Sequence, residues 1–370
     1  MRQPPRCPFR DCPNHKRPAP RFYRRHGTYR AKCHKKPIRR FRCKACERTF
    51  SEQTFRCSYR DKRPDLNLMT LTFLLLGVGF RSGSRKARLS RRCYVKKARK
   101  LARNVALLDR NLQVRARRKH LVDGGPDHIC AQMDELHTFE GCKYSRPVIA
   151  SVLIERETRF AISSEVASIL PTGKMTPRRI RQIARDEERF GKRVDESPDA
   201  CRKSFRALGA LFPGRTTFTL ETDLRPMYPR YVRETLGERV LSHSRTPGSE
   251  PRGFGTPLFP INLFETIARD HMGRLRRQSW LHTKLREWLK LFMDLHRGAK
   301  NWATPRFNAD RETPAQLLKL APRALSDEEL IGFRQDWGQY SPCPFGNGSR
   351  SMLDLHWDGV TKGPEMRVCA

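Results

Sequence analysis

The feature that most constrains the fold of this chain is a set of four cysteines arranged in two short turns. Four residues separate Cys7 from Cys12, two separate Cys43 from Cys46, and 30 residues lie between the pairs. Zinc is held by four ligands in a tetrahedron, and turns of this length place two thiolates on one side of the ion. We therefore expect a structural Zn²⁺ ion bound by Cys7, Cys12, Cys43 and Cys46.

The segment between the two cysteine pairs reads as short strands with few apolar positions. These are Phe22, Tyr23, Tyr29 and Phe41. So small a core does not fold alone, and the metal would supply the missing folding energy. The sequence predicts a zinc-ribbon module, a small β structure, over residues 1–60. Two alternatives stay open, namely substitute ligands at Cys33 and His34, or four unrelated reduced cysteines.

Positive charge is concentrated in the first third of the chain. Residues 1–120 hold 37 Lys and Arg against 6 Asp and Glu, whereas the remaining 250 residues hold 39 and 32. An excess of this size repels itself unless a polyanion offsets it. A solvated or disordered tail is the alternative, but cysteine, leucine and aromatic residues interleave with the charge. We expect a nucleic-acid-binding front half attached to a second part with a different role.

Three helical segments follow the cysteines. An apolar run spans Leu68 to Leu76, a short run spans Ser84 to Leu89, and a long basic run begins at Ser90 and continues to about Leu108. The apolar residues of the third run recur every three or four positions, which indicates one buried face; they are Tyr94, Ala98, Leu101, Val105 and Leu108. The order predicts a helix-turn-helix module over residues 61–120. A bundle with a basic exposed face is the alternative.

The last helix of such a module enters the major groove of DNA. The cations expected to bind DNA from it are Arg91, Arg92, Lys96, Lys97 and Lys100.

From residue 126 the pattern changes to strands and helices. Three consecutive strands joined by short turns are predicted at His128–Phe139, Val148–Glu155 and Arg159–Val166. Two more strands are expected at Thr217–Asp223 and Arg239–His243, with helical segments at 172–210 and Tyr228–Leu236. This order predicts an α/β domain over residues 126–298, a mixed five-stranded sheet flanked by helices.

The end of that domain reads as helical. A long helical region opens at Ile261, and its Asn262 and Glu265 share a face because they are three residues apart. The apolar stripe of a core helix is predicted farther along, at Leu281, Leu285, Trp288, Leu289 and Phe292. Residues 299–370 form an extension of unknown role, with short helical pieces near Ala315–Leu320 and Asp327–Asp336.

Three acidic residues stand at unusual places in this pattern. Asp134 interrupts an apolar strand, Asp223 ends another strand, and Glu265 lies on the late helix. Each has an ordinary alternative: Asp134 as a loop acid, Asp223 as a helix cap, and Glu265 as an exposed helix acid. Rival acids stand close to each, namely Glu135, Glu221 and Asp270. Strand alternation directs Glu135 to the opposite face from Asp134.

The order of these acids resembles the DDE triad of RNase H-like transposases. More narrowly, Asn262-Leu-Phe-Glu265 followed by the Arg-rich stretch His271 to Ser279 resembles bacterial insertion-sequence transposases of the group typified by insertion sequence one. Asp134-Glu-Leu-His137, Thr222-Asp223 and Thr313-Pro-Ala-Gln316 add to the resemblance, as do the cysteine pairs and basic helices. It covers about residues 7–320. The first cysteine turn and the long interval between Asp134 and Asp223 depart from the pattern.

The resemblance implies a DNA transposase that performs Mg²⁺-dependent strand cleavage and strand transfer. Two Mg²⁺ or Mn²⁺ ions would be held by Asp134, Asp223 and Glu265, with Asp134 bridging both. Asn262, Arg274, Arg277 and Lys284 would contact DNA. The implied partners are double-stranded DNA, both element ends and target, and further copies of the chain in a homo-oligomer.

Other functions remain open from the sequence. A zinc-ribbon and helix-turn-helix transcription regulator with an inactive RNase H-like domain would not need the three acids. A metal-dependent nuclease would cleave without strand transfer, and a basic RNA-binding protein would show no preference for element ends.

The sequence carries no sign of a membrane partner. The start MRQPPRCPFR lacks an apolar core, and the stretch Leu66 to Phe80 is interrupted by polar residues and glycines. We expect a soluble protein of the bacterial cytoplasm, associated with the nucleoid through DNA.

Overall fold

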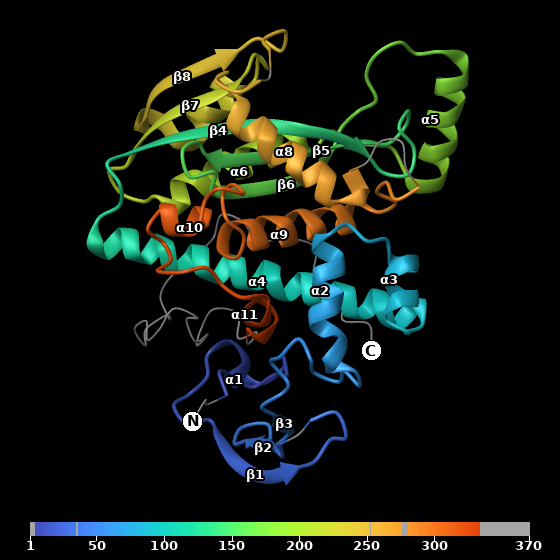
Figure 1. Cartoon of the computed structure of the whole chain (residues 1–370), viewed down its shortest axis with the longest axis vertical. Helices are drawn as coiled ribbons and strands as arrows, with labels where there is room; N and C mark the ends of the chain where they lie inside the picture. The colour runs from blue at the N-terminus through green and yellow to red at the C-terminus, as the bar shows by residue number, and fades with distance from the viewer. Residues whose placement is uncertain (1–3, 35, 252, 276–279, 334–370) are drawn as a thin grey trace. The chain divides into compact units, whose positions relative to one another are not determined.

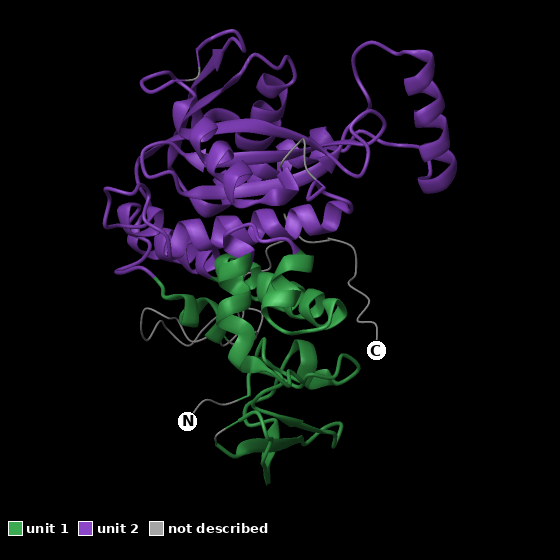
Figure 2. Ribbon diagram, turned by 45° about the vertical axis from the view of Figure 1, so that its right-hand side comes forward, with its two compact units in different colours: residues 1–73, 80–111, 325–355 green, residues 74–79, 112–324, 356–370 purple. Residues whose placement is uncertain are grey.

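The computed structural model of the chain describes residues 4–34, 36–251, 253–275 and 280–333. The chain forms two compact units (Figure 2). Of the described residues, the first unit contains 4–34, 36–73, 80–111 and 325–333, and the second contains 74–79, 112–251, 253–275 and 280–324. The four-part division predicted from the sequence stays a prediction. Each unit is described by itself below.

The first unit begins with a three-stranded antiparallel sheet. Its strands are β1 (Tyr23–Tyr29), β2 (Ile38–Cys43) and β3 (Thr49–Ser51), in that order. The small core beside the sheet combines cysteines with aromatic rings, and consists of Cys7, Cys12, Phe22, Phe41, Cys43, Phe50 and Phe55. Tyr29, expected to be an apolar position, is exposed because β1 is covered by little besides β2.

Helices make up the rest of the first unit. They are α1 (Pro13–Lys16), the 3-10 turn η1 (Pro64–Leu66), α2 (Asn67–Leu75), α3 (Phe80–Lys86), α4 (Arg91–Asp123) and α11 (Asp327–Gly332). The last two residues of α2 and the last third of α4 belong to the second unit. Helix α11 brings a distant segment back to the first unit, because Leu330 O accepts a hydrogen bond from Asn104 Nδ2 at 2.7 Å.

Helix α4 confirms the predicted buried face and is longer than predicted. The five apolar residues expected on that face are all at most 1% exposed. The helix continues past Leu108 to Asp123, because Leu112 and Ala116 extend the same buried stripe.

The second unit contains the predicted mixed five-stranded sheet (Figure 1). The strands are β4 (His128–Phe139), β5 (Pro147–Glu155), β6 (Ala161–Ser168), β7 (Thr217–Asp223) and β8 (Val240–Thr246), in the order β6-β5-β4-β7-β8. β4, β5 and β6 are antiparallel neighbours, whereas β4–β7 and β7–β8 are parallel. The first strand of the domain therefore lies at the centre of the sheet.

Helices cover both faces of this sheet. The helices of the second unit are α5 (Pro177–Phe190), α6 (Ser197–Leu211), α7 (Tyr228–Leu236), α8 (Phe259–His271), α9 (Arg286–Trp302) and α10 (Pro314–Leu317), with 3-10 turns η2 (Gly237–Arg239) and η3 (Gly273–Leu275). Helix α5 buries no residue and does not cover the sheet. Ser204 of α6 contacts Ser151 and Ser163 on one face. Within the described ranges, the helices are too short or too polar to cross a lipid bilayer.

The opposite face carries α8 and α9, and here one prediction is corrected. Helix α9 begins at Arg286, so Leu281 and Leu285 are not part of its buried stripe. Both are exposed, at 41% and 50%. Leu285 has an extended backbone and precedes the first helical residue, whereas Trp288 and the two later apolar residues are buried as predicted.

Candidate functional site

The four cysteines predicted to bind metal come together in the first unit. Their sulfur atoms all lie within 4.8 Å of one another. Cys7 Sγ lies 3.6 Å from Cys46 Sγ, and Cys12 Sγ lies 3.7 Å from Cys43 Sγ. A zinc tetrahedron with bonds of about 2.3 Å has sulfur–sulfur edges of about 3.8 Å, so the spacing fits zinc.

The surroundings of this centre lower the pKa of the Cys46 thiol and raise the pKa values of the Cys7 and Cys12 thiols. Burial raises the pKa of Cys46, but hydrogen bonds from the Arg48 backbone and side chain outweigh burial and bring that pKa to about 7. Burial raises the pKa of the Cys7 thiol, which makes its ionisation dependent on a bound cation. Cys33, considered as a substitute ligand, instead points its sulfur at the Asp61 carbonyl oxygen, 3.4 Å away.

In the second unit, the strand register brings Asp134 and Asp223 to equivalent positions on adjacent strands. Met133 of β4 pairs with Thr222 of β7 in a parallel ladder, and the two acids are the next residues of the two strands. Neighbouring strands lie about 4.8 Å apart, and residues in register point to the same face. The register therefore places Asp134 and Asp223 at neighbouring backbone positions on the same face of the sheet.

That face of the sheet is the one covered by α8. Gln132, two residues before Asp134, accepts a hydrogen bond on Oε1 from Ile261 N at 3.0 Å and donates one from Nε2 to Pro257 O at 2.6 Å. Glu265 follows Ile261 by four residues, one helical turn or about 6 Å along the axis, and Asp134 follows Gln132 by about 6.6 Å along the strand.

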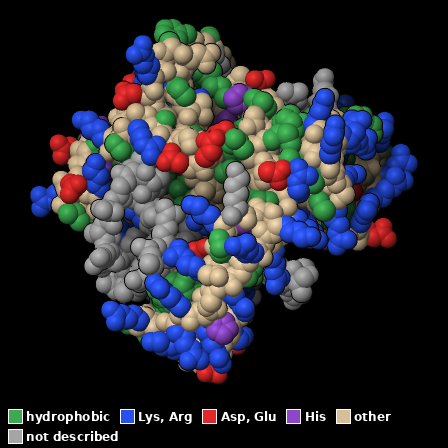
Figure 3. Space-filling model, turned by 60° about the horizontal axis from the view of Figure 1, so that its bottom comes forward, with side chains coloured by type: hydrophobic (Ala, Val, Ile, Leu, Met, Phe, Trp, Pro, Cys, Tyr) green, Lys and Arg blue, Asp and Glu red, His purple; other side chains and the backbone are tan. Residues whose placement is uncertain are grey.

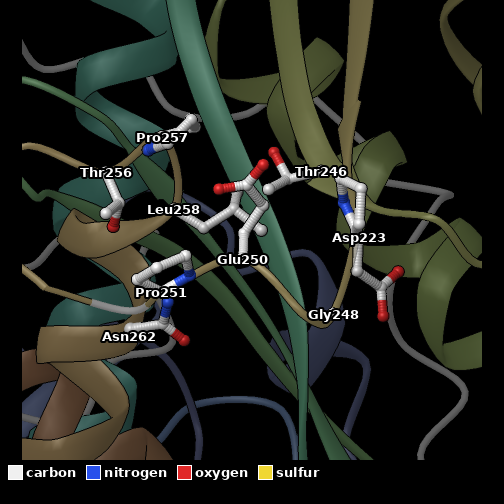
Figure 4. Close-up of a pocket in the computed structure, with 10 residues that line it drawn as sticks. Asp223, Thr246, Gly248, Glu250, Pro251, Thr256, Pro257, Leu258 and Asn262 are labelled. Carbon is white, nitrogen blue, oxygen red and sulfur yellow. The ribbon is translucent and has the colours of Figure 1, made fainter.

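Asp223 and α8 also share a pocket (Figure 4). The pocket is small and partly open to solvent, and it is lined by Asp223, Thr246, Pro247, Gly248, Glu250, Pro251, Thr256, Pro257, Leu258 and Asn262. Figure 4 shows Asp223 on one side, Asn262 of α8 on the other, and Glu250 between them. The pocket thus joins the end of β7 to the helix that carries Glu265.

Two of these carboxylates are buried. Asp134 is 7% exposed and Glu265 is 6% exposed. A buried carboxylate is costly unless cations or hydrogen bonds compensate it. Arg269 Nη2 lies 4.0 Å from Glu265 Oε2, at the outer limit of an ion pair. Glu135 N donates to Asp134 Oδ1 at 2.7 Å.

The carboxylates are not gathered as closely as the sulfurs. Among the described residues, the four cysteines are the group of three or more candidate ligands lying within 4.8 Å of one another. Two ions about 3.5–4 Å apart, each about 2.1 Å from its ligand oxygens, can span carboxylates roughly 8 Å apart.

The rival acids have other contacts. Glu135 faces away, as strand alternation predicts, and forms an ion pair with Arg225 beside the Cys201 thiol. Glu221 shares the face of Asp223 but accepts hydrogen bonds from Gln132 and from Arg156, at 2.6 and 2.8 Å.

The capping alternative for Asp223 does not hold. The residue that precedes α7 as its N-cap is Met227. Asp223 Oδ1 instead accepts a hydrogen bond from Arg225 N at 3.1 Å, closing the turn directly after β7. Asp270, the rival of Glu265, is exposed.

The basic residues expected to bind DNA fall into distinct environments. Arg91, Arg92 and Lys96 are exposed on α4. Lys100 is exposed, and its ammonium donates to Tyr59 O at 2.6 Å. Lys97 is buried in an ion pair with Asp61 and also donates to Asn67 Oδ1 and Arg63 O. Its charge stabilises the fold of the first unit.

The cations after α8 differ in the same way. Arg274 is half-buried and stacks over Phe292 and Trp288, at 4.6 and 5.2 Å from the ring centroids, and burial lowers its pKa to about 10. Lys284 is exposed and contacts His282. Arg277 lies outside the described residues.

Two residues of this site were missed by sequence reasoning. Gln132 is fully buried and ties β4 to α8. Its signal was a second polar residue two positions before Asp134 in an apolar strand, on the same face. Glu250 lines the pocket from a connecting segment, and no local pattern marks it.

Comparisons with known proteins do not identify a family for this chain. No protein-family model and no curated protein sequence matches the chain. Among solved structures, a chain described as the crystal structure of a pre-cleavage Mos1 transpososome aligns at 11% identity and a TM-score of 0.21, covering 70% of this chain and 75% of that one. A similarity of that size does not establish a common fold, and we base no functional inference on it.

Proposed function

We propose that this chain is a metal-dependent DNA transposase of the DDE type, in which Asp134, Asp223 and Glu265 hold two divalent cations. One observation carries the proposal: the parallel register of β4 and β7 sets Asp134 beside Asp223 on the face crossed by α8, the helix with Asn262 and Glu265. Residues distant in sequence are thus brought to one face by three separate elements.

The donor set fits Mg²⁺ or Mn²⁺. Carboxylate oxygens are the hard ligands these ions prefer, and a few of them suffice because the ions keep several waters. A pair of bound ions would supply electrostatic stabilisation of the entering and leaving oxygens in phosphodiester cleavage and strand transfer.

The protein side chains would position the reacting DNA. Asp134 on the central strand, Asp223 and Glu265 would hold the ions. Asn262 lies about one turn before Glu265 and lines the pocket with Asp223. In this proposal it would orient Glu265 or contact a phosphate. In the first unit, exposed cations of α4 would hold the DNA backbone beside a zinc-stabilised β module. DNA ends, target DNA and further copies of the chain are the proposed partners.

The test is cleavage and joining of DNA that carries the ends of the element, in Mg²⁺. Asp134→Asn, Asp223→Asn and Glu265→Gln are each expected to lower the rate by at least about 10³-fold, because removing a metal-bridging charge removes several kcal/mol of transition-state stabilisation. Asp270→Asn, a neutralised exposed acid on the same helix, is the matched control and should cleave as the wild type does.

Equal rates for Asp134→Asn and wild type would refute the catalytic assignment. Cleavage without joined product in the wild type would indicate a nuclease. DNA binding with neither reaction would favour the regulator, whose sequence-specific binding does not need the acids.

A further inference from the structure

Helix α5 is an element that the core of the second unit does not use. It lies in a 28-residue connection between β6 and α6, and none of its residues is buried. Figure 1 shows it standing clear of the sheet. Polar helices without a buried face are marginal in water, so its presence calls for a role outside the core.

The residues at the two ends of α5 nonetheless favour helix formation there. Thr176 is its N-cap, and the Thr176 side chain accepts a hydrogen bond from Arg179 N. Pro177 occupies the first turn, where its missing N–H costs nothing. Gly191 ends the helix with a positive φ of 82°, a conformation that glycine adopts readily.

One side of α5 is anchored to the connection between β4 and β5. Arg179 Nε donates to Tyr144 O at 3.1 Å, Ser145 Oγ donates to Asp186, and the Arg146 guanidinium lies 4.2 Å from the centroid of the Phe190 ring. The anchors fall near both ends of the helix. The helix is therefore held in a defined orientation even though it buries no side chain.

A second side of α5 presents a row of arginines. Arg178, Arg181, Arg185 and Arg189 are spaced by three, four and four residues and are all exposed. At 100° per residue they share one stripe, about a third of a turn from the anchored side. Glu188 lies at the edge of this stripe and Glu187 outside it. The row spans 11 residues, or about 16.5 Å.

The row is available to a partner. Within the part of the chain that the structure describes, the side chains of Arg178, Arg181 and Arg185 form no hydrogen bond or ion pair. Figure 3 shows Lys and Arg side chains gathered over the region of α5. One DNA strand carries a phosphate every 3.4 Å of helix axis, so a row of this length faces about five phosphates.

We propose that this arginine row, Arg178, Arg181, Arg185 and Arg189, is a second DNA-binding surface, which binds the backbone of duplex DNA flanking the candidate catalytic site. The proposal rests on the proposed function for its substrate, double-stranded DNA. The position of the anchor supports it, because the β4–β5 connection leaves the strand five residues after Asp134, about 17 Å away. A DNA duplex bound at the three acids and running toward the C-terminal end of β4 would reach α5 within about one helical turn of DNA, which is roughly 34–36 Å.

The test measures the salt dependence of DNA binding by the full chain. The variant Arg178→Gln/Arg181→Gln/Arg185→Gln is compared with Lys203→Gln/Arg206→Gln/Arg233→Gln, which removes the same charge from exposed positions on α6 and α7. Both carry Asp223→Asn, so that binding is read without DNA cleavage. The probe is a fluorescent 40-bp duplex of arbitrary sequence, titrated between about 50 and 300 mM KCl.

Loss of three phosphate contacts is expected to reduce the slope of log K against log salt by about 2.7. The α6/α7 variant should keep the slope of the parent, and Arg178→Lys/Arg181→Lys/Arg185→Lys should restore most of the lost slope because lysine still binds phosphate. Circular dichroism should match for all variants, since these arginines make no tertiary contact that folding needs.

An unchanged slope in the glutamine variant, or an equal fall in both variants, would overturn the proposal. So would a fall seen only with an RNA duplex of the same length. None of these readouts depends on catalysis. If the wild type failed to cleave DNA while the two variants still differed in slope, the catalytic assignment would be wrong and the proposed DNA-binding surface of α5 would still be supported.

Discussion

Two adjacent lysines of α4 show that a shift of one position along a helix can change a side chain from exposed to buried. Lys96 is exposed, whereas the ammonium of Lys97 is buried against Asp61 and Asn67. Both were expected to bind DNA from their place in a basic run. A step of one residue rotates a side chain by 100°, which carries Lys97 from the surface into the first unit. Its basic character therefore serves folding and not recognition.

These two lysines should separate stability from DNA affinity. Lys97→Ala leaves the half-buried Asp61 carboxylate without its buried cation, and we expect the first unit to lose about 3–5 kcal/mol. Lys96→Ala should change stability by less than about 0.5 kcal/mol and weaken DNA binding. Urea unfolding and fluorescence anisotropy with duplex DNA measure the two effects. Similar stability for the two variants would contradict the burial of Lys97.

At the scale of elements, the contact between β4 and α8 decides whether the acids can act together. The local sequence of neither element determines the position along β4 at which α8 packs. Gln132 supplies it, since one amide side chain contacts Ile261 N, Pro257 O and Glu221. The α8 N-terminus is thereby held at a defined point along β4, and Glu265 with it.

Removing this amide should impair the positioning of Glu265. Gln132→Ala leaves buried polar groups unsatisfied and should cost about 1–3 kcal/mol of stability. We also expect a 10- to 100-fold lower cleavage rate and a higher half-saturating Mg²⁺ concentration, with unchanged DNA affinity.

The control for Gln132→Ala is an exchange that removes a hydroxyl group and keeps the size of the side chain. Thr219→Val alters a polar side chain on the same face of β7, but the Thr219 hydroxyl contacts His128 and Ser242 rather than α8. It should leave the Mg²⁺ dependence as in the wild type. A Gln132→Ala protein with a normal Mg²⁺ requirement would show that the amide only stabilises the fold.

At the scale of the whole molecule, the two units draw stability from different sources. The small β module has a core of cysteines and a few aromatic rings, too little to fold without metal. The second unit has a five-stranded sheet with helices on both faces and many fully buried side chains. Metal removal should therefore act on one unit only.

Zinc content and proteolysis test this division. The protein should contain about one zinc ion per chain, and Cys43→Ser should lose it and expose residues 4–60 to protease while the sheet of the second unit stays resistant. Cys33→Ser should keep its zinc, because the Cys33 sulfur is directed at the Asp61 carbonyl. Full zinc occupancy in Cys43→Ser would contradict the four-cysteine centre.

The sequence by itself determined the features that depend on local order. Strand periodicity placed β4 and β7 at their observed bounds, cysteine spacing predicted the four sulfurs that meet, and the recurrence of apolar residues predicted the buried face of α4. Each of these follows from chain geometry over a few residues.

Only the tertiary structure decided which distant residues are neighbours. The parallel pairing of β4 with β7, the amide of Gln132 under α8, the burial of Lys97, and the unburied α5 with its arginine row all depend on packing between segments far apart in the chain. Local patterns cannot encode these relations, because side-chain packing and strand register are set by the free energy of the assembled fold.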